Sequence, residues 1–320
     1  MRNLLATPHP SSEDIRVVGA DWVEINCLFK AGGNISREDF ARAIARLGSI
    51  RDQRAQIIAA DVFSELQDRI DACRSFTNTV NAYPFVLNEQ STALMMRRPF
   101  QGRSSTALLY WFLLLVCRVN MDSRSRILVS LDPTKLFEMV CADVLRSFWG
   151  CRGRYADALI FGTARPGVNR SFRKSINQLC ELLGEGLGWK PDARVPGGGD
   201  GSLDVVAWRK FSDNRPGSLI GFGQCKTGLH WKDELDKLQP AKFSRRFFRQ
   251  PFVVEPVRLY MVPWRVDKEQ WTTHTDRGGI LLDRCRIAQY GDAVAPRVLM
   301  QCRACANAAV QQYRERTRAR

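Results

Sequence analysis

The chain has 320 residues, of which 45% are hydrophobic and 25% are charged, a balance that excludes an intrinsically disordered or fibrous protein. Its 48 lysines and arginines outnumber 33 aspartates and glutamates, so the formal net charge is +15. An excess of positive charge attracts polyanions, among which nucleic acid is the most common partner of proteins. We therefore expect contact with nucleic acid.

Residues 1 to about 130 are predicted to form a mostly helical region of unknown role. Ser36 and Asp39 have the spacing of a capping box at the start of a helix. Apolar residues at helical spacing predict two amphipathic helices, with Phe40, Ala43, Ile44 and Leu47 in the first and Ile57, Val62, Phe63, Leu66 and Ile70 in the second. The apolar run at 107–117 is shorter than the ~20 residues that span a bilayer, so we expect a buried helix and no membrane contact.

Ten cysteines occur at irregular spacing, and no segment has the regions of a signal peptide. This pattern is typical of the reduced, buried thiols of a cytoplasmic protein. Cys302 and Cys305 form a CxxC pair, but a zinc site needs a second such pair or two histidines close by. We therefore expect a cytoplasmic protein and do not expect zinc.

From Asp132 onward the pattern changes to alternating helices and strands. Asp132 and Pro133 predict the start of a helix whose inner face carries Leu136, Val140, Val144 and Phe148. The following elements are predicted to be a strand at 158–162, a helix at 171–187 that buries Leu183 and Leu187, strands at 202–208 and 218–226, a helical region at 231–250, and strands at 257–264 and 279–290. This order favours an α/β fold with a central sheet flanked by helices.

The strands at 202–208 and 218–226 carry polar residues that apolar strands rarely contain. Asp204 shares a face with Val206 and Trp208, and Gln224 shares a face with Lys226, because strand side chains alternate. If the two strands pair so that these faces coincide, a carboxylate, an amide and an ammonium group meet at one end of the sheet. Such groups are costly on apolar strands unless they act together. We regard this constellation as the candidate active site.

Several other chemistries lack the residues that they require. Only three histidines are present, which disfavours histidine-metal nucleases and deaminases. No GxSxG motif indicates a serine hydrolase. The segment GFGQCKTG lacks the glycine that a phosphate-binding loop needs before Lys226, since Cys225 stands there.

The polar residues of the two central strands offer oxygen ligands, and oxygen ligands are those that Mg²⁺ prefers. We expect Asp204, the side-chain oxygen of Gln224 and the backbone carbonyl of Cys225 to hold one metal ion. Lys226 would orient the attacking water and stabilise charge on the phosphate. The bound metal would polarise the scissile phosphate and lower the pKa of its water.

These residues resemble the motif of the PD-(D/E)xK nuclease superfamily, and most closely that of the Mrr-type restriction endonucleases. That branch shows a GDGxxD element followed by QxK, and the matching residues here are Gly199, Asp200, Gly201, Asp204, Gln224 and Lys226. The likeness covers Leu136 to Tyr290. It implies a restriction-endonuclease-like core and Mg²⁺-dependent cleavage of DNA, with Mn²⁺ as a substitute metal, in restriction or anti-phage defence. Asp200 either sets the turn or lies near the metal.

The family usually adds a glutamate from the helix before the strands, within a Phe-Glu pair. Phe137 and Glu138 match that pair but lie one helix too early. A helix inserted into the core would reconcile Glu138 with the site. The rival is Glu181, which lies on the helix at the expected distance. We favour Glu138.

Basic residues after the second central strand are candidates for DNA contact. They are Lys242, Arg245, Arg246 and Arg249, among aromatic residues that are either part of the same surface or buried. Contacts of this kind bind the phosphate backbone and are sensitive to salt. Cutting both strands with one site per chain would favour a dimer.

We divide the chain into a mostly helical region at 1–130, a nuclease domain at 131–300 and a basic tail at 301–320. The first region would sense a signal, contact DNA or bind a regulatory partner. The alternative to an endonuclease is a non-catalytic nucleic-acid-binding or assembly subunit that keeps the nuclease fold. The uncertain helix glutamate and the neutral Gln224 favour that alternative, whereas the retained Lys226 favours the enzyme.

Overall fold

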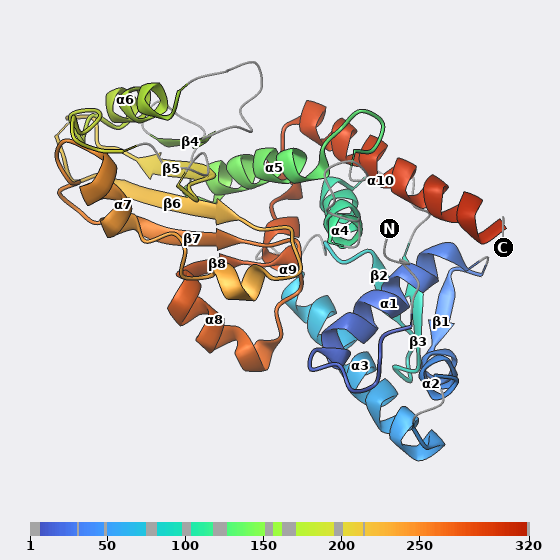
Figure 1. The fold of residues 1–320 in the computed structure, drawn as a ribbon. Coiled ribbons are helices and arrows are strands. Elements are labelled where there is room, and N and C mark those ends of the chain that lie inside the picture. Colours follow the sequence, from blue (N-terminus) through green and yellow to red (C-terminus); the bar gives the residue numbers. More distant parts are fainter. Residues whose placement is uncertain are drawn as a thin grey trace.

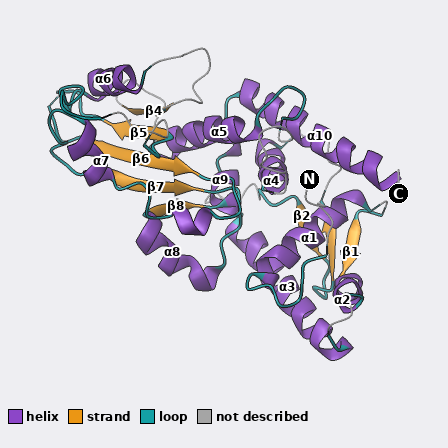
Figure 2. Cartoon of the chain, in the orientation of Figure 1, coloured by secondary structure: helices purple, strands orange, loops and turns teal. Residues whose placement is uncertain are grey.

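The computed structural model describes residues 7–30, 32–47, 50–74, 82–97, 104–117, 127–150, 156–161, 171–194, 201–213 and 215–318. These residues form a mixed α/β fold with ten α-helices, a five-stranded sheet and a separate three-stranded sheet (Figures 1 and 2). The α/β class expected from the sequence is confirmed.

The described helices are α1 (Ile15–Phe29), α2 (Arg37–Ala45), α3 (Asp52–Ala72), α4 (Ser105–Val116), α5 (Pro133–Phe148), α6 (Phe172–Leu183), α7 (Pro240–Phe247), α8 (Trp271–Gly278), α9 (Arg284–Ala288) and α10 (Pro296–Arg318). The described strands are β1 (Asn34–Ser36), β2 (Phe85–Leu87), β3 (Ala93–Met96), β4 (Ala156–Ile160), β5 (Val205–Arg209), β6 (Leu219–Cys225), β7 (Val257–Met261) and β8 (Ile280–Leu282).

The first part of the chain contains α1 to α4, as expected, together with the antiparallel sheet β1-β3-β2. Sequence reasoning missed this sheet because strands of three or four residues are too short to show alternation. The capping box is confirmed: the Ser36 side chain accepts from the Asp39 N–H, and the Asp39 carboxylate accepts from the Ser36 N–H. Helix α4 is buried as predicted. Among the described residues, no helix has the combination of length and apolarity that crossing a membrane requires.

The large sheet has the order β4-β5-β6-β7-β8. Strands β4, β5 and β6 are antiparallel, and β6, β7 and β8 are parallel. Helix α5 packs on one face of this sheet, and α6, α7 and α8 pack on the other (Figure 1).

Two glycines of β6 leave room for neighbouring side chains on the face of the sheet that α5 covers. A Cβ atom on Gly221 would lie 2.7 Å from the Leu259 side chain and 3.0 Å from Trp149, at the end of α5. A Cβ atom on Gly223 would lie 2.8 Å from the Met261 side chain. Both positions therefore require glycine for packing, and β6 alternates these glycines with the large side chains of its other face.

Four sequence predictions are wrong in detail. Ile57 and Leu47 are 58% and 45% exposed, so the buried stripes of α3 and α2 do not include them. Helix α6 ends at Leu183, because Gly184 adopts a left-handed conformation (φ 75°), and Leu187 is consequently 64% exposed. Phe148 is 41% exposed at the end of α5.

The last predicted strand, at 279–290, is shorter than expected. Strand β8 ends at Leu282, and the Asp283 carboxylate accepts from the Arg286 N–H at 3.0 Å. This contact caps α9, so the residues that were predicted to continue the strand form a helix instead. Helix α10 then continues across residue 300, and its buried residues Cys302, Cys305 and Ala309 belong to the core that also contains α4 and α5.

A fully buried ionic network joins the first helices to the end of the large sheet. Arg69 contacts Asp21 and Glu24, each at 2.7 Å, and Arg284 contacts Asp21 at 2.8 Å. Tyr83 and Tyr110 both donate hydrogen bonds to Glu24. Five of these six side chains come from the first 110 residues of the sequence, whereas Arg284 follows β8.

A second group of charges extends the ionic network toward β7. Arg265 contacts Glu65 at 3.3 Å and Asp283 at 2.6 Å, and Arg69 also contacts Glu65 at 3.0 Å. The carboxylates of Glu65 and Asp283 are fully buried. Buried carboxylates need cationic partners, because the free-energy cost of removing their charge from water is otherwise too large.

We predict that Arg69→Met lowers the free energy of unfolding by about 3–5 kcal/mol, because it leaves buried carboxylates without a cationic partner. The exposed pair of Arg42 with Asp39 is the matched control, and Arg42→Met should cost less than about 1 kcal/mol. Urea unfolding followed by circular dichroism measures both. Equal, small effects of the two substitutions would contradict a structural role for the network.

Candidate active site

The two central strands bring Asp204 to the carboxyl end of β6. Asp204 directly precedes β5, and its N–H donates to the carbonyl of Gly223 at 2.9 Å. Its carboxylate oxygen Oδ2 accepts from the Cys225 N–H at 2.7 Å. The Asp204 carboxylate is therefore held beside the last residues of β6, as the pairing of the strands predicts.

Gln224 is fully buried on the face of β6 that carries Phe222, and it lies in register with Tyr260 of β7. Neither its Oε1 nor its Nε2 atom has a hydrogen-bond partner within the described structure. A buried polar group without a partner costs about 1–3 kcal/mol. Such a side chain is expected where an amide serves a ligand rather than the fold.

Lys226 follows β6 and projects to the same face as Gln224. Its ammonium group contacts the Glu234 carboxylate at 2.7 Å, and both side chains are little more than a quarter exposed. Although burial acts to raise the pKa of Glu234, the hydrogen bond and positive charge of Lys226 lower it overall. Lys226 is thus oriented by an anionic partner.

Sequence reasoning missed Glu234. It lies in the short 3-10 helix Trp231–Glu234, which the Tyr260 hydroxyl anchors by donating to the Trp231 carbonyl at 2.7 Å. Trp231 was the only signal in the sequence, as an aromatic residue that needs a place in the core. No local pattern shows that this turn folds back onto Lys226.

Glu138 lies on α5, which packs directly against β4, β5 and β6. Burial raises the pKa of the Cys225 thiol, and the negative charges of Asp204 and Glu138 raise it further. The same two carboxylates act on the thiol of Cys141, one turn after Glu138. Glu138 and Asp204 therefore approach the same pair of cysteines at the end of β6.

Glu181 occupies a different part of the structure. Helix α6 covers the sheet face opposite α5, and the Glu181 residue is exposed. Lys210, after β5, donates to the Leu182 carbonyl at 2.7 Å, which places the end of α6 at the far end of β5 from Asp204. Helix α6 lies between β4 and β5 in the chain, and α5 remains in contact with the strands.

The candidate residues do not all share one face. Gln224 and Lys226 project away from α5, whereas the Cys225 side chain contacts Cys141 of α5. Asp204 lies at the strand end, and its charge acts on the Cys225 thiol and also on Tyr260, whose pKa is raised mainly by burial. The site therefore straddles the carboxyl end of β6 and does not lie on a single face.

The residues provide oxygen donors suited to a hard cation: the carboxylates of Asp204 and Glu138, the unpaired amide oxygen of Gln224 and the carbonyl of Cys225. Within the described ranges, no three side chains of His, Cys, Asp or Glu form a metal-binding cluster. Asp200 lies outside the described residues. The chemistry of the donor set fits Mg²⁺, with few anionic ligands.

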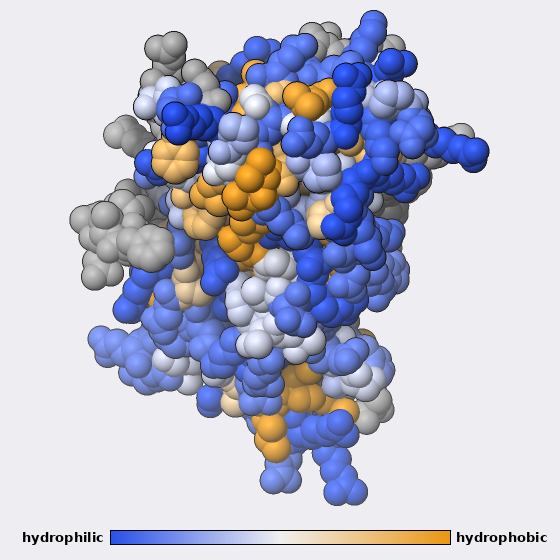
Figure 3. All heavy atoms as spheres, turned by 90° about the vertical axis from the view of Figure 1, so that its left-hand side faces the viewer, coloured by the Kyte–Doolittle hydropathy of each residue, from blue (hydrophilic) through white to orange (hydrophobic). Residues whose placement is uncertain are grey.

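The basic residues proposed for DNA contact lie on or directly after α7, and Lys242, Arg245, Arg246 and Arg249 are all exposed. Phe243 and Phe247 are buried in the core beneath them. Figure 3 shows the side of the molecule on which α6 and α7 lie, where hydrophilic side chains cover most of the surface around smaller hydrophobic patches.

No known protein-family model, curated protein or solved structure matches this chain. The function must therefore be inferred from the residues and their geometry.

We predict that Gln224→Leu leaves the free energy of unfolding of the metal-free protein unchanged or raises it by about 1–2 kcal/mol, because it removes a buried amide that lacks partners. Ser244→Ala is the control, since the buried Ser244 hydroxyl donates to the Pro240 carbonyl at 2.8 Å and its loss should cost about 1 kcal/mol. Denaturant unfolding in the presence of chelator measures both. A destabilised Gln224→Leu protein would show that the amide supports the fold.

We predict that Glu234→Gln destabilises the protein at pH 7 and that this difference disappears in acid. The pKa of Glu234 is below its ordinary value of 4.5 in the folded protein, so its ionised form stabilises the fold above that pH. The stabilisation is lost as pH falls through the folded pKa. Unfolding of both proteins across pH 3 to 7 measures the difference, and a pH-independent difference would contradict the role of the ion pair.

Proposed function

We propose that this protein is a metal-dependent endonuclease that hydrolyses DNA phosphodiester bonds. The observation that carries the proposal is the placement of Asp204, an unpaired buried Gln224 and Lys226 around the carboxyl end of β6. A carboxylate, an amide oxygen and an oriented ammonium group are the groups that metal-assisted hydrolysis of a phosphodiester requires.

The fold supports the proposal through the order of its elements. Helix α5, the antiparallel strands β4, β5 and β6, helix α7 and the parallel strand β7 follow one another along the chain. The sheet is mixed and has helices on both faces, as a restriction-endonuclease-like core would require. In this proposal, α6 would be the inserted helix that reconciles the position of Glu138 with the site.

In the proposed reaction, Asp204, the Gln224 oxygen and the Cys225 carbonyl would hold Mg²⁺, with Glu138 as a further carboxylate. The bound metal would polarise the phosphate and lower the pKa of its water. Lys226 would exchange its contact with Glu234 for the phosphate or the attacking water. The exposed cations on and after α7 would hold the DNA backbone in a salt-sensitive manner.

The biological setting that we propose for this activity is restriction or anti-phage defence. The resemblance of the sequence motifs supports it. A nuclease that acts on its host's DNA must be restrained, and residues 1–130 would bind the regulatory partner. Cleavage of both strands with one site per chain would favour a dimer.

The second candidate is a non-catalytic subunit that binds nucleic acid. One observation favours it: the Lys226 ammonium is paired with Glu234 at 2.7 Å, and this contact competes with its proposed catalytic contacts. In this case, the basic residues of α7 would still bind DNA. The metal and Asp204 would then contribute nothing to that binding.

We predict that the wild-type protein nicks or linearises supercoiled plasmid in Mg²⁺ and not in chelator. Asp204→Asn and Lys226→Ala should each lower the rate by at least about 100-fold, because the first removes the anionic ligand of the proposed metal and the second removes a positive charge beside the phosphate. Lys237→Ala is the matched control, since Lys237 contacts the same Glu234 but its side chain is 53% exposed. Gel electrophoresis of timed samples measures the rates.

The two glutamates give a further comparison in the same assay. Glu138→Gln should reduce cutting and Glu181→Gln should not, because the end of α6 lies at the far end of β5 from Asp204, and the Glu181 residue is exposed there. Undiminished cutting by Asp204→Asn and Lys226→Ala would exclude the proposed centre. Absence of cutting by the wild type, with DNA binding retained and insensitive to Asp204→Asn, would support the non-catalytic subunit.

A further inference from the structure

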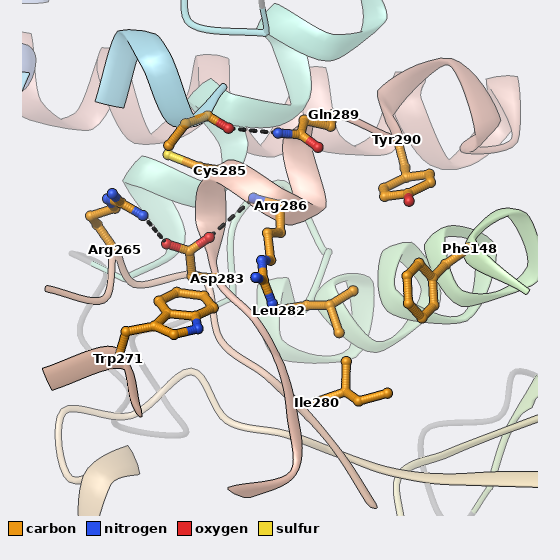
Figure 4. A pocket seen from close by; sticks show the side chains of 11 residues that line it. Phe148, Arg265, Trp271, Ile280, Leu282, Asp283, Cys285, Arg286, Gln289 and Tyr290 are labelled. Carbon is orange, nitrogen blue, oxygen red and sulfur yellow. Dashed lines mark hydrogen bonds and ion pairs between the residues drawn. The ribbon is translucent and has the colours of Figure 1, made fainter. Parts of the chain in front are cut away.

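A cavity of about 660 Å³ lies beside the edge strand β8, away from the candidate active site. Its walls come from the ends of α3 and α5, from β8, from the start of α8, and from α9 with Tyr290 (Figure 4). None of Asp204, Gln224 or Lys226 lines it. Cavities of about 300–1,000 Å³ are typical of small-molecule sites.

One side of the cavity is aromatic and aliphatic. Phe148, which is 41% exposed, meets the Tyr290 ring edge-on with centroids 6.2 Å apart. Ile280 and Leu282 project side by side from β8 toward these rings (Figure 4). Apolar and aromatic walls of this kind favour a planar, largely apolar ring system, because they remove its surface from water and can stack against it.

Arg286 supplies positive charge at the same cavity. Its guanidinium lies 4.3 Å from the centre of the Trp271 ring, and its Nη1 donates to the Leu281 carbonyl at 2.8 Å. These two contacts orient the side chain before any ligand arrives. A guanidinium has five N–H donors in all, so it can bind an anion while it keeps the bond to Leu281.

The phenol of Tyr290 is a further polar group in the wall of the cavity. Burial raises the pKa of Tyr290, and the positive charge of Arg286 acts in the opposite direction. Arg286 and Tyr290 both line the cavity, so the guanidinium and the hydroxyl are both available to a ligand within it. Both groups can donate hydrogen bonds to an anionic oxygen placed there.

The one carboxylate in the wall does not repel an anion, because its partners already compensate its charge. Asp283 contacts Arg265 at 2.6 Å and also accepts from the backbone N–H groups of Val266 and Arg286. Gln289 donates to the Ala72 carbonyl at 2.6 Å, and Figure 4 shows its amide oxygen turned toward the cavity. That oxygen can accept from an N–H group of a heterocycle.

We propose that this cavity binds a planar heteroaromatic anion of the size of a nucleoside monophosphate. The ring would lie against Phe148, Ile280 and Leu282, and the phosphate would contact Arg286 and Tyr290. The inference does not depend on the nuclease proposal, because the two sites share no residue. The proposed binding site for a small molecule lies at the junction between the end of α3 and the large sheet.

The test is isothermal titration calorimetry of the full chain, in chelator, with the four common nucleoside 5′-monophosphates and the matching nucleosides. At least one monophosphate should bind, and more tightly than its nucleoside. Arg286→Gln should lower the affinity for that monophosphate at least 10-fold and leave the affinity for the nucleoside unchanged. Phe148→Ala should weaken both, because it removes part of the ring site.

Arg277→Gln is the control, since Arg277 is a part-exposed arginine of α8 that is paired with Asp236 and does not line the cavity. It should bind as the wild type does, and thermal unfolding confirms that each variant is folded. Two results would overturn the proposal. One is that no monophosphate binds at millimolar concentration. The other is that binding is lost in Asp204→Asn but kept in Arg286→Gln, which would place the ligand at the candidate active site.

Discussion

The buried ionic network is the constraint on which the remaining structure depends. Asp21 and Arg284 are separated by more than 260 positions in the sequence, yet their charges are in contact at 2.8 Å and away from water. Charges in such surroundings are stable only as a group, because each carboxylate that loses its cation retains its full desolvation cost. The first helices and the end of the large sheet must therefore assemble together, and they share one hydrophobic core.

The sequence predicted those caps and strands that depend on residues close together in the chain. Ser36 with Asp39, Asp132 with Pro133, and the alternation around Gln224 each depend on neighbours in sequence, and the structure contains the corresponding caps and strands. The exposure of Ile57 could not be predicted. Helical spacing predicts which residues share the apolar face of a helix, but it does not predict how much of that face is buried. Glu234 and the choice between Glu138 and Glu181 depend on which helix packs on which face of the sheet, and that is set by tertiary contacts.

The candidate site combines a rigid part and an adjustable part. The Asp204 carboxylate is held by a backbone N–H at the end of a sheet, so its position is fixed by the pairing of β5 and β6. The Lys226 ammonium is held by a side chain at a part-exposed ion pair, which can exchange partners at little cost. In the proposed reaction, such a site would keep the carboxylate of Asp204 fixed and would free the Lys226 ammonium for an arriving phosphate.

The alternating glycines of β6 have a consequence for how this sequence can change. Gly221 and Gly223 face α5, while Phe222 and Gln224 face the opposite core. A shift of this strand by one residue would press Phe222 and Gln224 against α5 and leave glycines on the far side. The same short segment thus specifies helix packing and chemistry on alternate residues. An insertion or deletion within β6 would damage both at once, whereas substitutions in the loops on either side leave the alternation intact.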